Sequence, residues 1–155
     1  MARAKKIYTI GHSNRSLSDF LEIIKRYNIR IIVDVRRFPK SSRYPYYNRE
    51  ELEKVLRENH VDYIWLGDLL GGYRSGGYEE YMKTSDYLRG IEKLLNIIER
   101  AEDNIAIMCS EKLWFKCHRR FIANTLVNMG YEVIHIIDKD KVYTHRKRNN
   151  VITEK

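Results

Sequence analysis

Short apolar runs alternate with amphipathic segments along most of the 155-residue chain. The apolar runs lie at residues 6–11, 29–35, 61–67, 105–108 and 131–137, and each has the length and composition of a buried strand. Apolar residues at helical spacing follow the first four runs, in segments that open near Ser16, Asn48, Leu88 and Cys117. Five strands alternating with four helices predict an α/β fold, a single-domain three-layer α/β/α sandwich with a mainly parallel sheet of about five strands.

Residues at the ends of these segments indicate where the helices begin. Ser16, with Asp19 three residues later, has the pattern of an N-cap and predicts a helix that runs to about residue 28. Asn48 with Glu51 gives a similar signal for the second helix. We expect the domain core to span residues 6–138, with a basic tail at 139–155 that adds one edge strand or remains loose.

The composition narrows the class of partner and the compartment. A formal charge of +8 and a pI near 9.4 favour an anionic partner such as nucleic acid, phosphate or an acidic surface. A charged fraction of 32% is also typical of thermophilic proteins, so basic charge alone does not decide the function. No apolar stretch reaches the length of a membrane span, and the N-terminus lacks the apolar core of a signal peptide. We therefore expect a cytoplasmic protein with no membrane partner.

Polar residues follow the predicted strands at their carboxyl ends, where parallel α/β folds bind ligands. They are His12 and Ser13, then Asp34, Arg36 and Arg37, then the glycines around Gly71 and Gly72, and then Cys109 to Glu111. We expect them to converge on one cleft. The long loop regions after the second and third strands, the latter including Tyr73, hold seven of the twelve tyrosines. A core requirement would place fewer tyrosines outside strands and helices, and long loops in compact domains are usually functional.

Two thiols flank the loop between the fourth strand and the last helix. Cys117 is predicted in the first turn of that helix beside three basic residues, which would acidify its thiol and make it a nucleophile or a redox group. Cys117 could instead serve only as a helix cap. Cys109, at a strand end, is either a small buried apolar residue or a second reactive thiol. A disulfide between the two is conceivable, since intracellular proteins of hyperthermophiles sometimes keep such bonds.

Glu111 and His118 are the pair favoured for acid/base work, because a carboxylate beside an imidazole can orient it and tune its pKa. The alternative is an ion pair from Glu111 to Arg119 or Arg120. Asp34 either joins a cluster with His12 or caps its own loop. Four arginines, Arg36, Arg37, Arg119 and Arg120, either bind an anion or are solvated surface charges. A metal bound by Cys109, Cys117 and His118 is disfavoured, since sequence neighbours seldom ligate one ion together, and we expect no cofactor.

The segments IYTIGHSNRS, IIVDVRRFPKS, LGDLLGG and MCSEKLWFKCHRR resemble domain-of-unknown-function family 488. The resemblance spans residues 7 to about 138 and implies the same kind of fold. It marks as signature positions Gly11, His12, Ser13, Asp34, Arg36, Pro39, Gly71, Cys109, Glu111, Cys117, His118 and Arg119. The segment KLWFK between Glu111 and Cys117 departs from the Pro-containing or acidic segment associated with the family.

Together these patterns predict an enzyme that acts on an anionic substrate in a cleft at the carboxyl ends of the strands. The expected substrate is a phosphorylated molecule, a nucleotide or a nucleic acid. The catalytic candidates are Glu111, His118, Asp34 and Cys117. The ligand-binding candidates are His12, Ser13, Arg36, Arg37, Gly71, Gly72, Tyr73, Cys109, Arg119 and Arg120. The alternatives are a non-catalytic nucleic-acid or nucleotide binding module and a thiol or redox protein.

Overall fold

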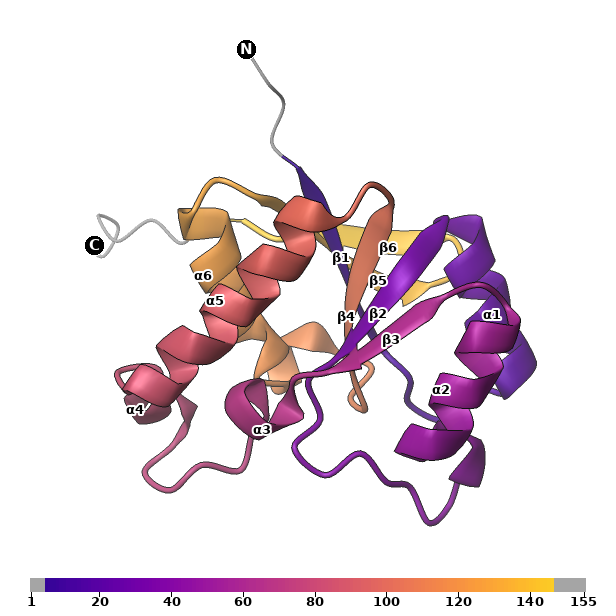
Figure 1. Ribbon diagram of the computed structural model, residues 1–155, viewed down its shortest axis with the longest axis horizontal. Helices are drawn as coiled ribbons and strands as arrows, with labels where there is room; N and C mark the ends of the chain where they lie inside the picture. The colour runs from indigo at the N-terminus through magenta and orange to yellow at the C-terminus, as the bar shows by residue number, and fades with distance from the viewer. Residues whose placement is uncertain (1–4, 147–155) are drawn as a thin grey trace.

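The computed structural model describes residues 5–146, and a six-stranded sheet in the order β3-β2-β4-β1-β5-β6 forms its middle layer (Figure 1). The parallel strands are β1 (Lys6–Gly11), β2 (Ile29–Asp34), β3 (Asp62–Trp65), β4 (Asn104–Cys109) and β5 (Glu132–Asp138). β6 (Lys141–Thr144) pairs antiparallel with β5 at one edge. The predicted α/β fold is therefore confirmed, and the sixth strand extends the sheet beyond the core expected to end at residue 138.

Helices cover both faces of the sheet, as the sequence pattern predicts. α5 (Ser85–Arg100) and α6 (Arg119–Asn128) lie on one face, and α1 (Leu17–Arg26) and α2 (Arg49–Glu58) lie on the other (Figure 1). Ile105 and Ile107 of β4 join the core under α5 and α6, whereas Ala106 and Met108 join the core under α1 and α2. Successive side chains of a strand point to opposite faces, so one buried apolar run supplies both cores.

The two predicted N-caps have different outcomes. Ser16 caps α1, since its hydroxyl accepts a hydrogen bond of 3.1 Å from the backbone N–H of Asp19. Asn48 occupies the N-cap position of α2, but its side chain accepts instead from the backbone N–H of Ser41 at 2.6 Å. Asn48 therefore fixes the loop that precedes α2, and the prediction of a capping hydrogen bond there is wrong.

The two loop regions are more ordered than the sequence suggests. A 3₁₀ turn (Pro45–Tyr47) lies in the first, and two short helices, α3 (Gly67–Leu70) and α4 (Tyr78–Tyr81), lie in the second. Most of the loop tyrosines pack inside the protein, with Tyr47, Tyr81 and Tyr87 buried, and Tyr73 alone among the seven is exposed. The expectation that these tyrosines lie outside strands and helices is wrong for Tyr78, Tyr81 and Tyr87, which belong to α4 and α5. In the described part of the chain no helix has both the length and the apolarity to cross a bilayer.

Candidate functional site

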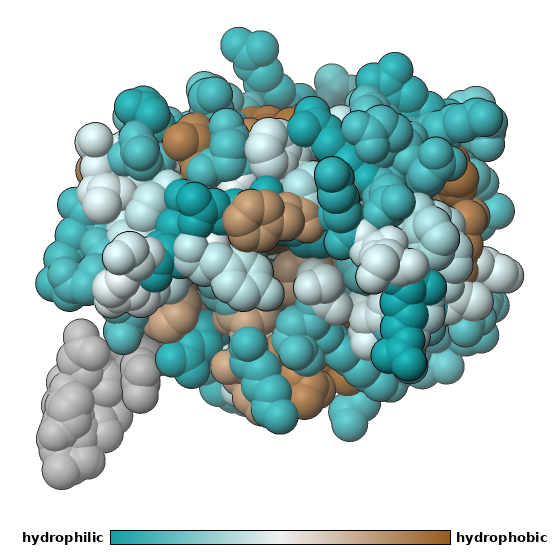
Figure 2. Space-filling view, turned by 90° about the horizontal axis from the view of Figure 1, so that it is seen from below, coloured by the Kyte–Doolittle hydropathy of each residue, from teal (hydrophilic) through white to brown (hydrophobic). Residues whose placement is uncertain are grey.

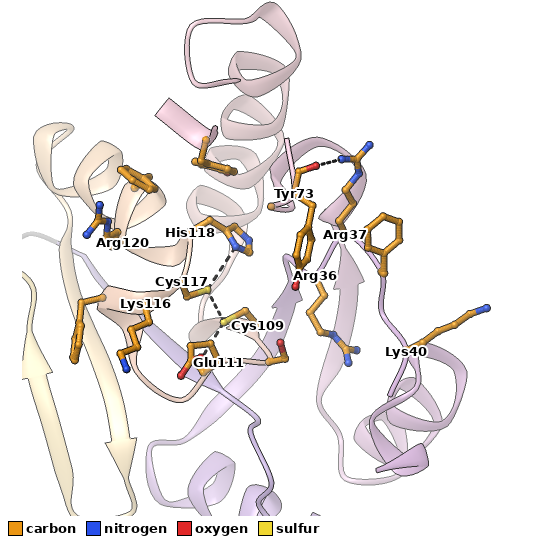
Figure 3. Close-up of a pocket in the computed structure, with 16 residues that line it drawn as sticks. Arg36, Arg37, Lys40, Tyr73, Cys109, Glu111, Lys116, Cys117, His118 and Arg120 are labelled. Carbon is orange, nitrogen blue, oxygen red and sulfur yellow. Dashed lines mark hydrogen bonds between the residues drawn. The ribbon is translucent and has the colours of Figure 1, made fainter. Parts of the chain in front are cut away.

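A cavity of about 830 Å³ opens at the carboxyl edge of the sheet, between the loops that follow β2, β3 and β4. Figure 2 looks onto the molecule from below and shows hydrophobic residues set among hydrophilic ones near the middle of this face. The cavity is lined by Arg36, Arg37, Phe38, Lys40, Gly72, Tyr73, Tyr78, Cys109, Ser110, Glu111, Phe115, Lys116, Cys117, His118, Arg120 and Phe121. Residues separated by up to 85 positions in sequence thus meet in one place (Figure 3).

The ends of β1 and β4 are joined tightly beneath this cavity. The backbone N–H groups of His12 and Ser13 donate to the carbonyls of Cys109 and Ser110, each at 2.9 Å. A Cβ atom on Gly11 would lie 1.7 Å from the carbonyl oxygen of Glu111, so only glycine permits this close approach. The loop that carries Glu111 is therefore held against the end of β1.

The two thiols lie side by side at the base of the cavity. The Sγ atoms of Cys109 and Cys117 are 2.8 Å apart, and both cysteines are free (Figure 3). Cys117 precedes α6 rather than lying in its first turn, because the helix begins at Arg119 with His118 at the N-cap position. The backbone N–H of Arg119 nevertheless donates to Cys117 Sγ at 3.4 Å. The predicted placement is thus wrong by two positions, since Cys117 precedes the N-cap residue, while a helix N–H still reaches the sulfur.

His118 is oriented toward Cys117 by the backbone. Its Nε2–H donates to the carbonyl of Val35 at 3.0 Å, which leaves Nδ1 facing Cys117 Sγ at 3.6 Å. The hydrogen bond from Cys109, together with His118, lowers the pKa of the Cys117 thiol well below its usual range. Burial raises the pKa of the Cys109 thiol. Cys117 is therefore the thiolate of the pair, and Cys109 is a neutral thiol that donates to it.

Arg119 lies beneath the thiols and does not line the cavity, since only 1% of it is exposed. Its guanidinium donates to the carbonyls of Glu111 and Lys112 and to the Thr9 hydroxyl, and its Nε has no hydrogen-bond partner. Within residues 5–146 no carboxylate pairs with it, so the alternative of a Glu111–Arg119 ion pair is wrong. Arg119 instead holds the thiol loop through its carbonyls and places a positive charge near both sulfurs.

A buried chain of hydrogen bonds continues from Arg119 across the sheet. Thr9 Oγ1 contacts His135 Nδ1 at 2.6 Å, His135 Nε2 contacts His145 Nδ1 at 2.9 Å, and His145 Nε2 contacts Asn124 Oδ1 at 2.6 Å. Because the guanidinium can only donate, each following group accepts from one side and donates to the other, and both imidazoles are neutral. Burial lowers the pKa of His135 to about 2 and also lowers the pKa of His145. No local sequence pattern predicts this hydrogen-bonded chain, because its residues come from separate segments of the fold.

Trp114 anchors the loop between the two cysteines to the edge of the sheet. Its ring stacks on His135 with centroids 4.5 Å apart and planes at 3°, and on Tyr143 of β6 at 5.3 Å and 12°. The KLWFK segment, which departs from the expected family pattern, therefore owes its position to a cross-strand pair on β5 and β6.

Asp34 is fully buried and takes no part in the lining of the cavity. It accepts hydrogen bonds from Arg36 Nε at 2.9 Å and Nη2 at 2.7 Å, and from the Tyr63 hydroxyl. Arg36 Nη1 in turn donates to the carbonyl of Tyr47 at 2.8 Å and approaches His12 Nε2 at 3.3 Å. Asp34 therefore positions Arg36, and the prediction that Asp34 is catalytic has no support from its surroundings.

His12 is a buried, neutral imidazole. It stacks on Tyr47 with centroids 4.1 Å apart, and its Nδ1–H donates to the carbonyl of Ser13 at 2.9 Å. Burial lowers its pKa to about 4. Its expected cluster with Asp34 is mediated by Arg36 rather than formed directly. His12 and Ser13 line a second, adjoining hollow of about 570 Å³ instead of the main cavity.

The remaining candidates divide into cavity residues and supporting residues. Glu111 lines the cavity and accepts from the backbone N–H of Leu113 at 3.0 Å, and no hydrogen bond joins it to His118 within residues 5–146. Arg37 donates to the Tyr73 carbonyl, which links the two long loops at the cavity mouth (Figure 3). Gly71 is buried against Arg37, whereas Gly72 faces the His118 ring and lines the cavity. The side chain of Arg120 lies over Phe121 at the rim.

No group of three His, Cys, Asp or Glu side chains in the described residues is arranged to hold a metal ion. A family model described as Domain of unknown function DUF488 matches residues 16–126. The searches of curated proteins and of solved structures found no match.

Proposed function

The chain belongs to the family named Domain of unknown function DUF488, whose name specifies no reaction, and we therefore propose a function from the chemistry of the cavity. We propose that the protein is an enzyme with Cys117 as its nucleophile, and that its substrate is anionic: a phosphorylated molecule, a nucleotide or a nucleic acid. The observation that carries this proposal is the Cys117 sulfur, which faces His118 Nδ1 at 3.6 Å inside an arginine-lined cavity.

The surroundings of Cys117 suit a nucleophile better than a structural thiol. His118 accepts the thiol proton on Nδ1 and, as an imidazolium, still donates from Nε2 to the Val35 carbonyl. The resulting thiolate receives the Cys109 S–H at 2.8 Å and the backbone N–H of Arg119 at 3.4 Å. These donors account for the lowered pKa of Cys117 and keep a thiolate available at neutral pH.

The cavity wall supplies the other roles. Arg37 and Arg120 line it without a carboxylate partner among the described residues, so each is free to bind an anionic group. Glu111 is the one carboxylate among the lining residues, and we assign it proton transfer to the leaving group or from the water that releases the covalent intermediate. Two free thiols in one site also suit a reducing compartment such as the cytoplasm.

The test begins with purified wild type screened against pooled nucleotides, phosphosugars and oligonucleotides. Any activity found should be abolished in Cys117→Ser and reduced about a hundredfold to ten-thousandfold in His118→Asn and Glu111→Gln. Lys93→Gln, on the exposed side of α5, serves as the control and should match wild type. Ligand binding without turnover would instead select a non-catalytic nucleotide or nucleic-acid binding module, and activity that survives all three cavity variants would refute the roles assigned to Cys117, His118 and Glu111.

A second candidate function is thiol redox chemistry, which the 2.8 Å contact between Cys109 and Cys117 favours. Joining the two sulfurs releases two electrons and two protons to an electron acceptor, which must be an oxidised substrate such as a disulfide. Turnover would then need both cysteines and a thiol reductant. Cys109→Ala separates the two candidates, because it abolishes redox turnover but leaves the Cys117 nucleophile in place.

A further inference from the structure

The second hollow adjoins the main cavity and shares two lining residues with it, Lys40 and Ser110. It is lined by His12, Ser13, Asn14, Lys40, Ser41, Ser42, Arg43, Tyr44 and Ser110. With about 570 Å³ it has the size of a small-molecule site, so the edge of the sheet offers two neighbouring places for parts of one ligand.

The charges along the two hollows are strongly one-sided. Their lining includes Arg36, Arg37, Lys40, Arg43, Lys116 and Arg120, against the single carboxylate of Glu111. The described residues form eight ion pairs, and Arg36 is the only one of these six cations that takes part in any of them. The second hollow adds three serines, Ser13, Ser41 and Ser42, to the shared Ser110, and it holds no carboxylate. Free cations beside hydroxyl donors are the chemistry of phosphate binding.

Exposed aromatic rings surround the main cavity. Phe38, Tyr73 and Phe115 all line it, with exposed fractions of 63%, 84% and 47%. Phe38 and Tyr73 lie close to each other, with ring centroids 6.0 Å apart, on loops that Arg37 joins. Exposed rings beside free cations suit unpaired nucleobases, because the bases of a duplex already stack on one another.

We propose that the two hollows bind consecutive nucleotides of a single-stranded nucleic acid, with the second hollow holding the phosphate next to the nucleotide that lies at Cys117. The position of the reacting nucleotide rests on the proposed function, whereas binding of the strand does not. A mononucleotide would fill only one hollow. The strand therefore gains contacts with Arg43 and with the serines that line only the second hollow, which a mononucleotide in the main cavity cannot make.

Binding to full-length protein is measured by fluorescence anisotropy with a labelled oligothymidylate of about ten nucleotides. Thymidine monophosphate, a duplex of the same length and inorganic polyphosphate then compete with it. We expect the oligonucleotide to compete about tenfold or more better than each of these at equal phosphate concentration. Equal competition by the mononucleotide would overturn the second subsite. Equal competition by the duplex or by polyphosphate would overturn single-strand recognition and would show that binding depends on charge only.

Two pairs of variants locate the contacts. Arg43→Gln should reduce the slope of log binding constant against log salt by about 0.7, the value for one lost phosphate contact on a single strand. Its control Arg57→Gln, an exposed charge on α2, should leave the slope unchanged. Phe38→Ala should weaken binding roughly 5- to 150-fold, and the control Leu88→Ala, at a similarly exposed position on α5, should not. Unchanged binding in both Arg43→Gln and Phe38→Ala would overturn the proposal.

Cys117→Ser keeps this inference separate from the proposed function. We expect this variant to lose any turnover but to keep the preference for the oligonucleotide over thymidine monophosphate, because Arg43 and the exposed aromatic rings are unchanged. Length-dependent binding together with turnover that survives Cys117→Ser would refute the nucleophile and leave the strand-binding site standing. Thiol-dependent turnover of a mononucleotide, with no gain from a longer strand, would refute the strand-binding site alone.

Discussion

The pH dependence of Cys117 alkylation tests the central electrostatic claim without knowledge of the substrate. A free cysteine has a pKa of about 8.5, so at pH values below this the rate of its reaction with iodoacetamide increases about tenfold for each unit by which the pH is raised. Three donors face Cys117 Sγ, from Cys109 at 2.8 Å, His118 at 3.6 Å and the backbone of Arg119 at 3.4 Å. They keep the thiolate ionised under mildly acidic conditions, so the rate should be nearly flat from about pH 5 to about pH 8.

The size of the effect follows from two opposing factors. At about pH 5 an ordinary thiol is only about 0.03% ionised, so a fully ionised Cys117 has about 3,000 times more thiolate. Intrinsic reactivity falls about threefold for each tenfold gain in acidity, which offsets much of that advantage. The protein should therefore react roughly tenfold faster than a cysteine peptide at about pH 5 and more slowly than the peptide at about pH 8. The crossing of the two profiles is the signature of a stabilised thiolate.

The assay follows loss of free thiol by mass spectrometry after timed alkylation. Cys109→Ala removes the donor at 2.8 Å and His118→Asn removes the imidazole, so each should move the rising part of the profile to higher pH. Ser110→Ala changes an exposed neighbour and should leave the profile unchanged. A wild-type rate that climbs tenfold per pH unit up to about pH 8 would refute the thiolate assignment.

Stability measurements check three other features of the fold. Burial lowers the pKa of His12 in the folded state to about 4, so neutral His12 contributes about 3 kcal/mol to the free energy of unfolding above about pH 6.5, and this contribution is lost as the pH falls toward 4. Urea unfolding at a series of pH values should show this loss. His12→Gln should lessen the loss, and His60→Asn, at an exposed position, should not. Trp114→Ala should cost about 1–3 kcal/mol in the same assay because two stacked partners are lost, whereas Phe115→Ala, whose side chain is half exposed, should cost below about 1 kcal/mol. Gly11→Ala should lower the melting temperature by several degrees or prevent folding, because its Cβ would meet a backbone carbonyl at 1.7 Å, and a melting temperature equal to that of wild type would contradict this contact.

The sequence predicts the layers of the fold because its hydrophobic pattern has the right period in each segment. The four long helices and five parallel strands all carry their apolar residues toward one of two cores. β6 was harder to predict, since Lys141–Thr144 is exposed throughout and shows no apolar run. Its pairing depends on β5, and partly on Tyr143 stacking against Trp114 from a distant loop. Tertiary contacts of this kind leave no periodic signal in the strand itself.

The location of the cavity was predictable, but the partners of its residues were not. Parallel strands bring their carboxyl ends to one edge of the sheet, which places Cys109 and the Arg36–Arg37 pair together regardless of how their side chains pack. Which charges pair depends on side-chain reach and burial. Asp34 binds Arg36 two residues away and is fully buried, although its strand-end position resembles that of a catalytic carboxylate. Position in a strand indicates the edge at which a residue lies, not whether its side chain faces ligand or core.

Arg119 links the stability of the fold to the chemistry of the thiols. A buried guanidinium without a carboxylate partner is costly, by several kcal/mol before compensation. Part of that cost is offset by carbonyls of the loop at 111–112 and by Thr9, whose hydroxyl donates onward through His135 and His145. No carboxylate pairs with Arg119 in the described chain, and its positive charge favours the ionised form of the Cys109–Cys117 pair by acting to lower the pKa of each thiol. Ionisation of Cys117 therefore stabilises the buried Arg119 as much as Arg119 stabilises the thiolate. A neutral replacement of either residue should disturb the other.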